Sequence, residues 1–374
     1  MGTLNGYKVI EMGGIGPAPF AGMLLADMGA EVIRIERKDT GLRFVSAKYE
    51  IMNRGKKSAF FDLKNEEDRK LVLGLIDTAD VLIDPYRPGV MEKFGFSPEI
   101  LAERNPGLVY GRITGYGQTG VLSGFAGHDI DYLAISGVLS AIGSKDKPSV
   151  PLNLIADFGA GGMLLLNGIL AALLEREKSG KGQVVDAAMV DGAAQMMSLF
   201  YGYMQAGFWS VNRESNLIDG GAPYYNVYET KDGKFIAIGA LEPQFYQRLK
   251  ELLKLDKKEF EDQLNAEKWP VQKEHLSRIF KQRTRDEWTA LLFRENSCVA
   301  PVLNMKEAIE FEPNKSRSVF TEQQGVIQPA PAPRFSRTPS KAGKLPEKYG
   351  LDTREIIRQL KSQKNDSNIR NISK

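Results

Sequence analysis

The segment that decides the fold is residues 7–36, YKVIEMGGIGPAPFAGMLLADMGAEVIRIE. It opens with a strand-like apolar run, turns through the glycine- and proline-rich stretch 13–19, and continues as an apolar helical stretch that stops at Gly29. A second strand-like run, AEVIRIE, follows directly. A strand, a helix and a strand in this order predict a parallel βαβ unit and an α/β fold.

The same alternation continues through the first half of the chain. We expect a helix over 71–79, strands at 80–84 and 106–117, and an apolar helix over 159–182 that ends in a glycine pair. A strand-like run, QVVDAAMV, and a further apolar helical stretch to about Gly207 follow. A large α/β domain is therefore expected over residues 1–207.

The pattern changes at Tyr224. The stretch YYNVYETKDGKFIAIGA predicts a hairpin that turns at LysAspGly, and amphipathic helices follow to about Arg294. These elements predict a smaller α+β domain over 222–315.

The prolines between Gln328 and Tyr349 exclude a helix there. We therefore expect an extended return segment over 316–360, packed on the large domain, and a flexible tail over 361–374.

Composition limits the class of protein. The 374 residues are 42% hydrophobic and carry one cysteine, which excludes an intramolecular disulfide and indicates a reducing, intracellular compartment. The net charge of +3 equals the excess of basic residues after Leu351, so the body is neutral, which argues against a nucleic-acid surface. The longest apolar run, 163–174, is interrupted and is shorter than the roughly 20 residues of a membrane span. We expect a soluble protein that binds no membrane; the chain does not end in an SKL-type tripeptide, and the organelle is not resolved.

A local basic segment lies between residues 34 and 64, with nine Lys or Arg residues against four acidic ones. Its cations are Arg34, Arg37, Lys38, Arg43, Lys48, Arg54, Lys56, Lys57 and Lys64. Such a segment either holds a small polyanion or forms an ordinary solvated face.

The turn after the first strand invites comparison with a dinucleotide site, since Gly14, Gly16 and Glu36 are near the expected places. Pro19 replaces the third glycine, and Pro17 removes an amide that a pyrophosphate uses. This interpretation is therefore disfavoured. Arg37, beside Glu36, is better suited to a phosphate monoester.

Two histidines are present, and they differ in context. His275 lies in a charged helical stretch and is expected at the surface, whereas His128, in FAGHDIDYLAISG, precedes an apolar helix-like run. The alternatives for His128 are a helix cap, a core group or a catalytic group.

Asp157, in PLNLIADFGAGGML, precedes the buried helix. It can be a helix N-cap, a catalytic carboxylate or both. Asn153 lies one turn upstream, where it could orient either Asp157 or His128, and the glycines after Asp157 would offer bare amides to an enolate oxygen. No cluster of histidine and cysteine at metal-ligand spacing and no GxSxG motif occurs, so neither a metal nor a serine nucleophile is expected.

Several motifs together resemble the α-methylacyl-CoA racemases of the family III CoA-transferase superfamily. They are GHDIDYLAISG, PLNLIADFGAGGM, KSGKGQVVDAAMVDG, LIDGGAPYYNVY, GALEPQFY and CVAPVLNM. The resemblance runs from about Leu4 to Arg337. It implies a Rossmann-like large domain that binds coenzyme A, a smaller α+β domain, and an interlocked homodimer with each active site between two subunits.

The resemblance also implies roles for individual residues. His128 and Asp157 would be the catalytic pair, and Glu242 would arrive from the partner chain to support His128. Acyl-CoA contacts would come from Arg37, the stretch Ala59, Phe60, Phe61 and Asp62, the turn with Gly127, Asp129 and Tyr132, and Lys93, where some relatives carry arginine. No cofactor is implied, because coenzyme A is part of the substrate.

The chemistry agrees with these residues. Inverting a carbon next to a thioester requires one group to remove a proton from one face and a second group to return a proton to the other. We therefore expect an isomerase that interconverts (2R)- and (2S)-2-methylacyl-CoA in branched-chain fatty acid or sterol side-chain metabolism. Two alternatives remain open: a CoA-transferase with Asp157 as nucleophile, and a catalytically silent acyl-CoA-binding protein.

Overall fold

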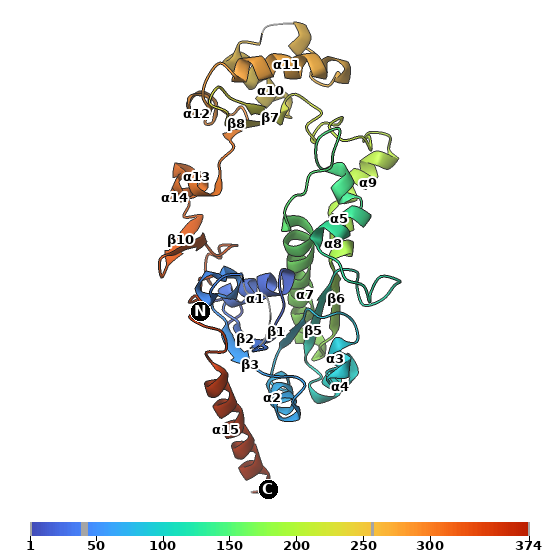
Figure 1. Cartoon of the computed structure of the whole chain (residues 1–374), viewed down its shortest axis with the longest axis vertical. Coiled ribbons are helices and arrows are strands. Elements are labelled where there is room, and N and C mark those ends of the chain that lie inside the picture. The colour runs from blue at the N-terminus through green and yellow to red at the C-terminus, as the bar shows by residue number, and fades with distance from the viewer. Residues whose placement is uncertain (1, 39–43, 256–257, 373–374) are drawn as a thin grey trace. The chain divides into compact units, whose positions relative to one another are not determined.

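A computed structural model describes residues 2–38, 44–255 and 258–372, with side chains described up to residue 362. The chain forms two compact units (Figure 1). The first comprises residues 1–136, 152–196 and 315–374, and the second comprises 137–151 and 197–314. The division differs from the one expected, because 137–151 and 197–207 belong to the second unit.

The first unit is built on a six-stranded parallel sheet in the order β3-β2-β1-β4-β5-β6. Its strands are β1 (Lys8–Met12), β2 (Glu31–Glu36), β3 (Lys57–Phe60), β4 (Val81–Asp84), β5 (Val109–Thr114) and β6 (Val184–Ala188). The predicted βαβ unit is confirmed as β1, α1 and β2. This strand order is that of a dinucleotide-binding fold. Strands are added outward from β1 in one direction and then, from β4 on, in the other, so the strand order reverses between β1 and β4.

Helices cover both faces of this sheet. The helices of the first unit are α1 (Pro17–Asp27), η1 (Ala47–Tyr49), η2 (Ile51–Asn53), α2 (Glu66–Ile76), α3 (Val90–Lys93), α4 (Pro98–Arg104), α5 (Asp129–Ile135), the π-helix η3 (Leu154–Gly162), α7 (Met163–Ser179), α8 (Met189–Met196) and α15 (Thr353–Ile372). A buried apolar cluster joins one sheet face to α2, α4 and α15. Helices α1 and α7 pack on each other and on strands of the sheet, α1 against β1 and β2 and α7 against β5 and β6.

Local sequence sets several helix ends. Pro17 occupies the first turn of α1, where its missing N–H is not needed. Asn65 caps α2 by accepting a hydrogen bond from the N–H of Asp68. Helix α7 ends at Gly180, whose φ of 73° suits glycine, as the sequence predicts.

The second unit holds the predicted hairpin, β7 (Tyr225–Glu229) and β8 (Phe235–Gly239), which pair antiparallel, with β9 (Val299–Pro301) beside β8. Its helices are α6 (Val138–Ala141), α9 (Ser198–Gln205), α10 (Pro243–Leu253), η4 (Lys258–Phe260), η5 (Ala266–Lys268), α11 (Trp269–Phe280), α12 (Arg285–Leu292) and α13 (Met305–Glu310), with α14 (Glu312–Ser316) at the boundary. Its core is aromatic, with Tyr224, Phe260, Phe280 and Trp288 buried.

The return segment lies in the first unit. It begins with the hairpin of β10 (Phe320–Gln323) and β11 (Val326–Pro329), and residues 330–352 contain no helix. Arg54 holds the end of this hairpin, because its guanidinium donates to the side chain of Gln328 and to the carbonyl of Pro329 at 2.9 and 2.7 Å. Beyond it, α15 extends to Ile372 and thus includes residues that were assigned to a tail.

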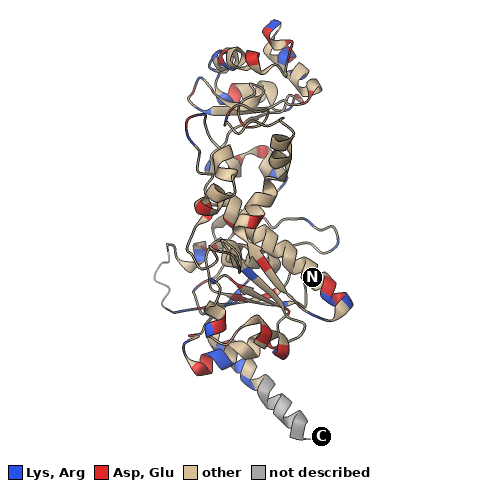
Figure 2. Cartoon of the chain, turned by 90° about the vertical axis from the view of Figure 1, so that its right-hand side faces the viewer, with Lys and Arg blue, Asp and Glu red and all other residues tan. Residues whose placement is uncertain are grey.

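One continuous helix, residues 154–179, is long and apolar enough to cross a membrane by length and composition. Its α7 portion instead buries Leu165, Ile169 and Leu173 in contact with β5 and β6, as a core helix of an α/β unit does. Figure 2 shows acidic and basic residues interspersed over the described helices and loops rather than gathered in one stripe.

Candidate functional site

The predicted site residues of the first unit follow the carboxyl ends of its strands. The turn 13–16 follows β1, Arg37 follows β2, Phe61 and Asp62 follow β3, Lys93 follows β4, and residues 127–132 follow β5. Because all six strands are parallel, these ends share one edge of the sheet, where α/β folds bind ligands. The topology therefore gathers segments that are far apart in the sequence.

Asp157 lies within the π-helix η3, which begins after Asn153 and runs directly into α7. Of the alternative roles for Asp157, the helix N-cap is excluded, since the helix starts three residues before it, after Asn153. The glycines after Asp157 are also inside the π-helix, where N–H groups donate to carbonyls five residues back, as Met163 does to Phe158. They are not bare amides. π-Helical turns occur frequently at functional sites.

The carboxylate of Asp157 is half-buried and has defined neighbours. The Asn153 side-chain amide donates to its Oδ2 at 3.0 Å, as the sequence predicts. Gly16 lies against the same oxygen, because a Cβ placed on Gly16 would be 3.0 Å from Oδ2. The φ of 68° at Gly16 is also one that residues with side chains rarely adopt.

The surroundings of Asp157 set the direction of its pKa. Burial raises the pKa of this carboxyl above its ordinary value of 3.8, and the nearby Asp129 carboxylate adds to the rise. The hydrogen bond from Asn153 and the positive charge of His128 act in the opposite direction. Asp157 is thus a stronger base than an exposed aspartate, and it feels the charge of His128.

His128 occupies the N-cap position of α5 and is exposed. Its backbone N–H donates to Asp131 Oδ2 at 2.9 Å, so the main chain closes the helix end while the imidazole remains available. The N–H groups of Asp129 and Ile130, in the first turn, have no intrahelical acceptor.

Asp129 links the two halves of the site. Its side chain is 4% exposed, and Oδ2 accepts the N–H of Asp157 at 2.8 Å. Tyr132 is also buried; its hydroxyl donates to the carbonyl of Gly127, and its ring meets Tyr116 edge-on at 5.0 Å. Asp129 and Tyr132 thus fix the position of His128 relative to Asp157. Tyr116 was not predicted; its spacing in GYGQ gives no signal for this contact.

The predicted coenzyme A contacts divide into two groups. Arg37, Asp62 and Lys93 are exposed; Arg37 directly follows β2, Asp62 lies two residues after β3, and Lys93 is the last residue of α3. Ala59 and Phe61 are buried at 0% and 2% exposure, so only their backbones can meet a ligand. The ring of Phe60 packs against Gly350 of the return segment, where an added Cβ would be 2.0 Å from Cδ2.

The basic segment is not one exposed patch. Arg34, Arg54 and Lys56 are buried in ion pairs, Arg54 with Asp27 and the other two with Glu11. Arg37, Lys38 and Lys64 are exposed, Lys48 and Lys57 are intermediate, and Arg43 lies outside the described residues.

Glu36, the acidic residue of the disfavoured dinucleotide interpretation, is 6% exposed and accepts the Ser58 hydroxyl at 2.7 Å. It is therefore directed into the sheet rather than to a ribose.

Glu242 and His275 belong to the second unit. Glu242 is exposed at the N-cap of α10, where its carbonyl accepts the N–H groups of Phe245 and Tyr246. His275, which was expected at the surface, is partly buried: its side chain is 19% exposed, contacts Glu259 through Nδ1 and packs on Phe260.

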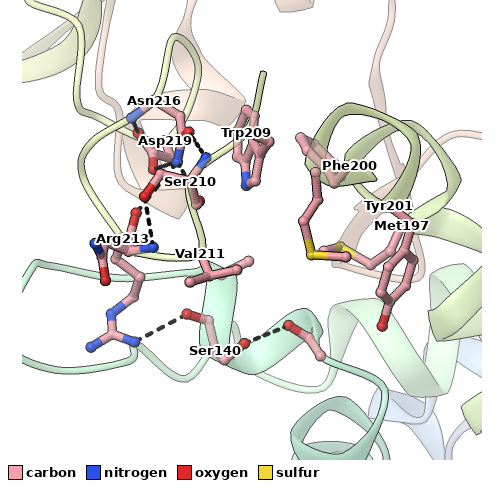
Figure 3. A pocket seen from close by; sticks show the side chains of 14 residues that line it. Ser140, Met197, Phe200, Tyr201, Trp209, Ser210, Val211, Arg213, Asn216 and Asp219 are labelled. Carbon is pink, nitrogen blue, oxygen red and sulfur yellow. Dashed lines mark hydrogen bonds between the residues drawn. The ribbon is translucent and has the colours of Figure 1, made fainter. Parts of the chain in front are cut away.

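A small pocket of about 110 Å³ lies within the second unit (Figure 3). Met197, Phe200 and Tyr201 of the α9 region lie on one side of it, and Trp209 and Val211 on the other. Ligand pockets usually measure at least about 300 Å³, and no predicted site residue lines this one. Over the described ranges of the chain, no three His, Cys, Asp or Glu side chains are grouped to hold a metal ion.

Comparisons with known proteins agree with this arrangement. The family model described as CoA-transferase family III matches residues 4–353. The chain is 43% identical to the mouse protein named alpha-methylacyl-CoA racemase, over 96% of this chain and 93% of that protein. It is 41% identical to the human protein of the same name, over 97% of each.

A crystal structure of a CAIB/BAIF family protein from Brucella suis superposes with a TM-score of 0.84 at 26% identity, covering 96% of this chain and 99% of that one. Both the sequence and the strand order thus point to one superfamily. The chain belongs to the CoA-transferase family III.

Proposed function

We propose that the protein is an α-methylacyl-CoA racemase, an isomerase that interconverts (2R)- and (2S)-2-methylacyl-CoA thioesters by proton transfer at C2. The observation that carries this proposal is the placement of His128 near Asp157: Asp129, which directly follows His128, accepts the N–H of Asp157 at 2.8 Å, so the imidazole and the carboxylate belong to one site. Relatives named racemase that are 41–43% identical over nearly the whole chain support it over the transferase alternative.

The reaction uses the two groups on opposite faces of C2. With the 2S substrate, neutral His128 removes the C2 proton and protonated Asp157 returns one to the other face. With the 2R substrate, ionised Asp157 is the base and protonated His128 is the acid. The raised pKa of Asp157 favours both directions, because it brings the carboxyl closer in basicity to an imidazole.

The intermediate between the two transfers is an enolate, whose oxygen needs hydrogen-bond donors. Asn153 orients Asp157 through the 3.0 Å hydrogen bond. The reaction as proposed needs neither a metal nor an organic cofactor.

The coenzyme A moiety would lie along the carboxyl edge of the sheet. Arg37 and Lys93 are exposed cations there, suited to phosphate groups, although lysine does not make the bidentate contact of arginine. Asp62, Gly127 and the backbone of residues 59–61 would complete this contact. The acyl chain is not assigned, and branched fatty acids and sterol side-chain acids are the proposed substrates.

Glu242 enters the proposal as a residue of a second copy of the chain. It is an exposed carboxylate at a helix start, and a carboxylate of this kind orients an imidazole and stabilises its protonated form. A homodimer would bring it to His128. We also propose an intracellular, soluble enzyme that binds neither nucleic acid nor membranes.

The direct test is incubation with a (2S)-2-methylacyl-CoA in D2O. We expect loss of configuration at C2 together with incorporation of deuterium there. Retained configuration without deuterium, in protein shown to be folded, would contradict the proposal. Transfer of labelled CoA to a free carboxylate acceptor would instead support a transferase in which Asp157 is the nucleophile.

A further inference from the structure

A buried ionic cluster lies beneath the turn between β1 and α1. It consists of Glu11 on β1, Arg34 on β2 and Lys56 just before β3, with side chains 0%, 10% and 1% exposed. Glu11 and Arg34 are register partners in neighbouring strands, so their side chains lie on the same face of the sheet. Glu11 bridges both cations, contacting Arg34 through Oε1 and Lys56 through Oε2 at 2.6 Å.

One cation of the cluster holds a carbonyl of the turn, and the other holds a carbonyl in the first turn of α1. Arg34 donates to the carbonyl of Gly14 at 2.8 Å, and Lys56 donates to the carbonyl of Pro19 at 2.9 Å. These two carbonyls lie on either side of Gly16. The backbone is therefore held on both sides of Gly16, whose positive φ of 68° is one that glycine adopts readily.

That middle residue is the one that meets the catalytic carboxylate. Gly16 lies against Asp157, and the next turn of α1 packs on the π-helix through the rings of Phe20 and Phe158, 5.1 Å apart. A shift of the turn would consequently move the surface on which the Asp157 carboxylate rests. No residue of the cluster itself touches Asp157 among the contacts that the described residues make.

Burying these three charged side chains is energetically unfavourable, which indicates that the cluster does more than fill space in the core. Burial lowers the pKa of Lys56 to about 8, although Glu11 opposes the change. Gly22 of α1 is needed to admit the cluster, because a Cβ there would be 1.9 Å from Glu11 Oε2. Buried ion pairs of this kind stabilise a fold less well than apolar residues of the same volume, but they fix one geometry.

We propose that Glu11, Arg34 and Lys56 are positioning residues for proton transfer by Asp157, acting by holding the turn around Gly16. This inference rests on the proposed racemase function. The residues touch neither substrate nor the reacting atoms. Their effect is confined to one of the two catalytic groups, because His128 belongs to α5, which the cluster does not contact through any hydrogen bond of the described residues.

The test uses Lys56→Met in the full-length protein, with Lys8→Met as matched control. Lys8 is the first residue of β1 and is partly buried, but it bonds to Thr78 at the opposite end of the strand from the cluster. Two quantities are measured for the 2S substrate in D2O: inversion, which needs Asp157, and deuterium exchange with retained configuration, in which His128 breaks the C2–H bond and returns a deuteron to the same face.

For Lys56→Met we expect inversion to slow by about 10- to 100-fold, as small misplacements of a reacting group do. We expect exchange with retention to persist, the KM to stay unchanged, and Lys8→Met to behave like the native protein. An equal fall in inversion and exchange, or no fall in either, would overturn the inference. If Lys56→Met is poorly folded, Glu11→Gln/Lys56→Met removes one charge of each sign and takes its place.

A second readout does not depend on activity. Hydrogen exchange of the amides of Gly13 and Phe20, which donate to Ile35 and Gly16, reports on the turn directly. We expect faster exchange there in Lys56→Met but not in Lys8→Met, and unchanged protection would overturn the inference. If the native protein shows no chemistry at C2, the proposed function fails, while this readout still decides whether the cluster holds the turn.

Discussion

His128 and Asp157 lie in the same unit but in different surroundings. His128 is exposed at the start of a short helix, and only its backbone is engaged in the helix cap. Asp157 is half-buried within a π-helix, bonded by Asn153, backed by Gly16 and close to a second carboxylate, Asp129. Asp157 thus has more contacts with the rest of the protein than His128 has.

The chemistry gives a reason for this difference. A histidine ordinarily titrates near pH 6.5 and an aspartate near 3.9, so an unmodified pair would be badly matched for transfer in both directions. Burial and the Asp129 charge raise the pKa of Asp157, and Asn153 limits the rise. The difference shows that the pKa of the carboxylate, rather than that of the imidazole, is the one that the surrounding residues adjust.

The largest expected effect follows from removing either group. His128→Ala and Asp157→Ala should each lower inversion by about 10²- to 10⁴-fold, the usual contribution of a general acid or base. Both should still bind coenzyme A, since the exposed cations Arg37 and Lys93 are untouched. Chiral analysis of the product and calorimetric binding of CoA check the two statements. Retained inversion in either variant would remove that residue from the mechanism.

Gly16→Ala should have the next largest effect, and it acts on the aspartate alone. The new Cβ would be 3.0 Å from Asp157 Oδ2 at a φ of 68°, so the carboxylate has to move. We expect inversion to slow by about 10- to 100-fold. Gly180→Ala is the control, because Gly180 has a φ of 73° and no atoms near its added Cβ. Equal losses in the two variants would show general strain rather than a displaced carboxylate.

Asn153→Ala should change the pH dependence of the reaction with the 2R substrate more than the maximal rate of that reaction. The Asn153 hydrogen bond lowers the pKa of Asp157, so its loss raises that pKa further. Asp157 must be ionised to act on the 2R substrate, and the acidic limb of that pH profile should therefore move to higher pH. A shift to lower pH would contradict the assigned interaction.

The smallest expected effect concerns stability rather than activity: Asp157→Asn, which removes the charge and with it the activity, should make the folded protein more stable. The folded-state pKa of Asp157 lies above its unfolded value of 3.8, so ionisation is less favourable in the folded protein. The native protein therefore loses stability as the pH rises from about 3.8 through the folded-state pKa, and the asparagine variant does not. Above that range the variant should be more stable by up to about 1 kcal/mol. Thermal unfolding at several pH values measures it, and equal stability at neutral pH would argue against the burial cost.

Much of the fold is predictable from local sequence. The unit over 7–36 and the hairpin at 225–239 follow from alternation, glycines and turn residues, and the structure confirms both. Strand β3, KSAF, was missed because it is short and carries Lys57 and Ser58. It is a strand because β2 supplies its partner and Glu36 accepts the Ser58 hydroxyl, which local sequence does not reveal.

The candidate site was predictable in its residue types but not in its geometry. The stretch around Asp157 is typical of a helix cap, and nothing in it marks a π-helix, which depends on packing against α1 and α8. Arg34 and Lys56 looked like part of a charged surface because sequence does not show which charges are paired inside. The contact of Gly16 with Asp157 joins positions 141 residues apart (157 less 16).

The most direct test measures deuterium exchange separately for the substrate on which His128 acts and for the substrate on which Asp157 acts. Asp157→Asn and His128→Ala are incubated in D2O with pure 2S and pure 2R 2-methylacyl-CoA, and deuterium at C2 is measured. We predict that Asp157→Asn exchanges the 2S substrate with retention but not the 2R substrate, and that His128→Ala shows the reverse. Loss of exchange with both substrates in one variant, while CoA binding persists, would contradict the division of work between His128 and Asp157.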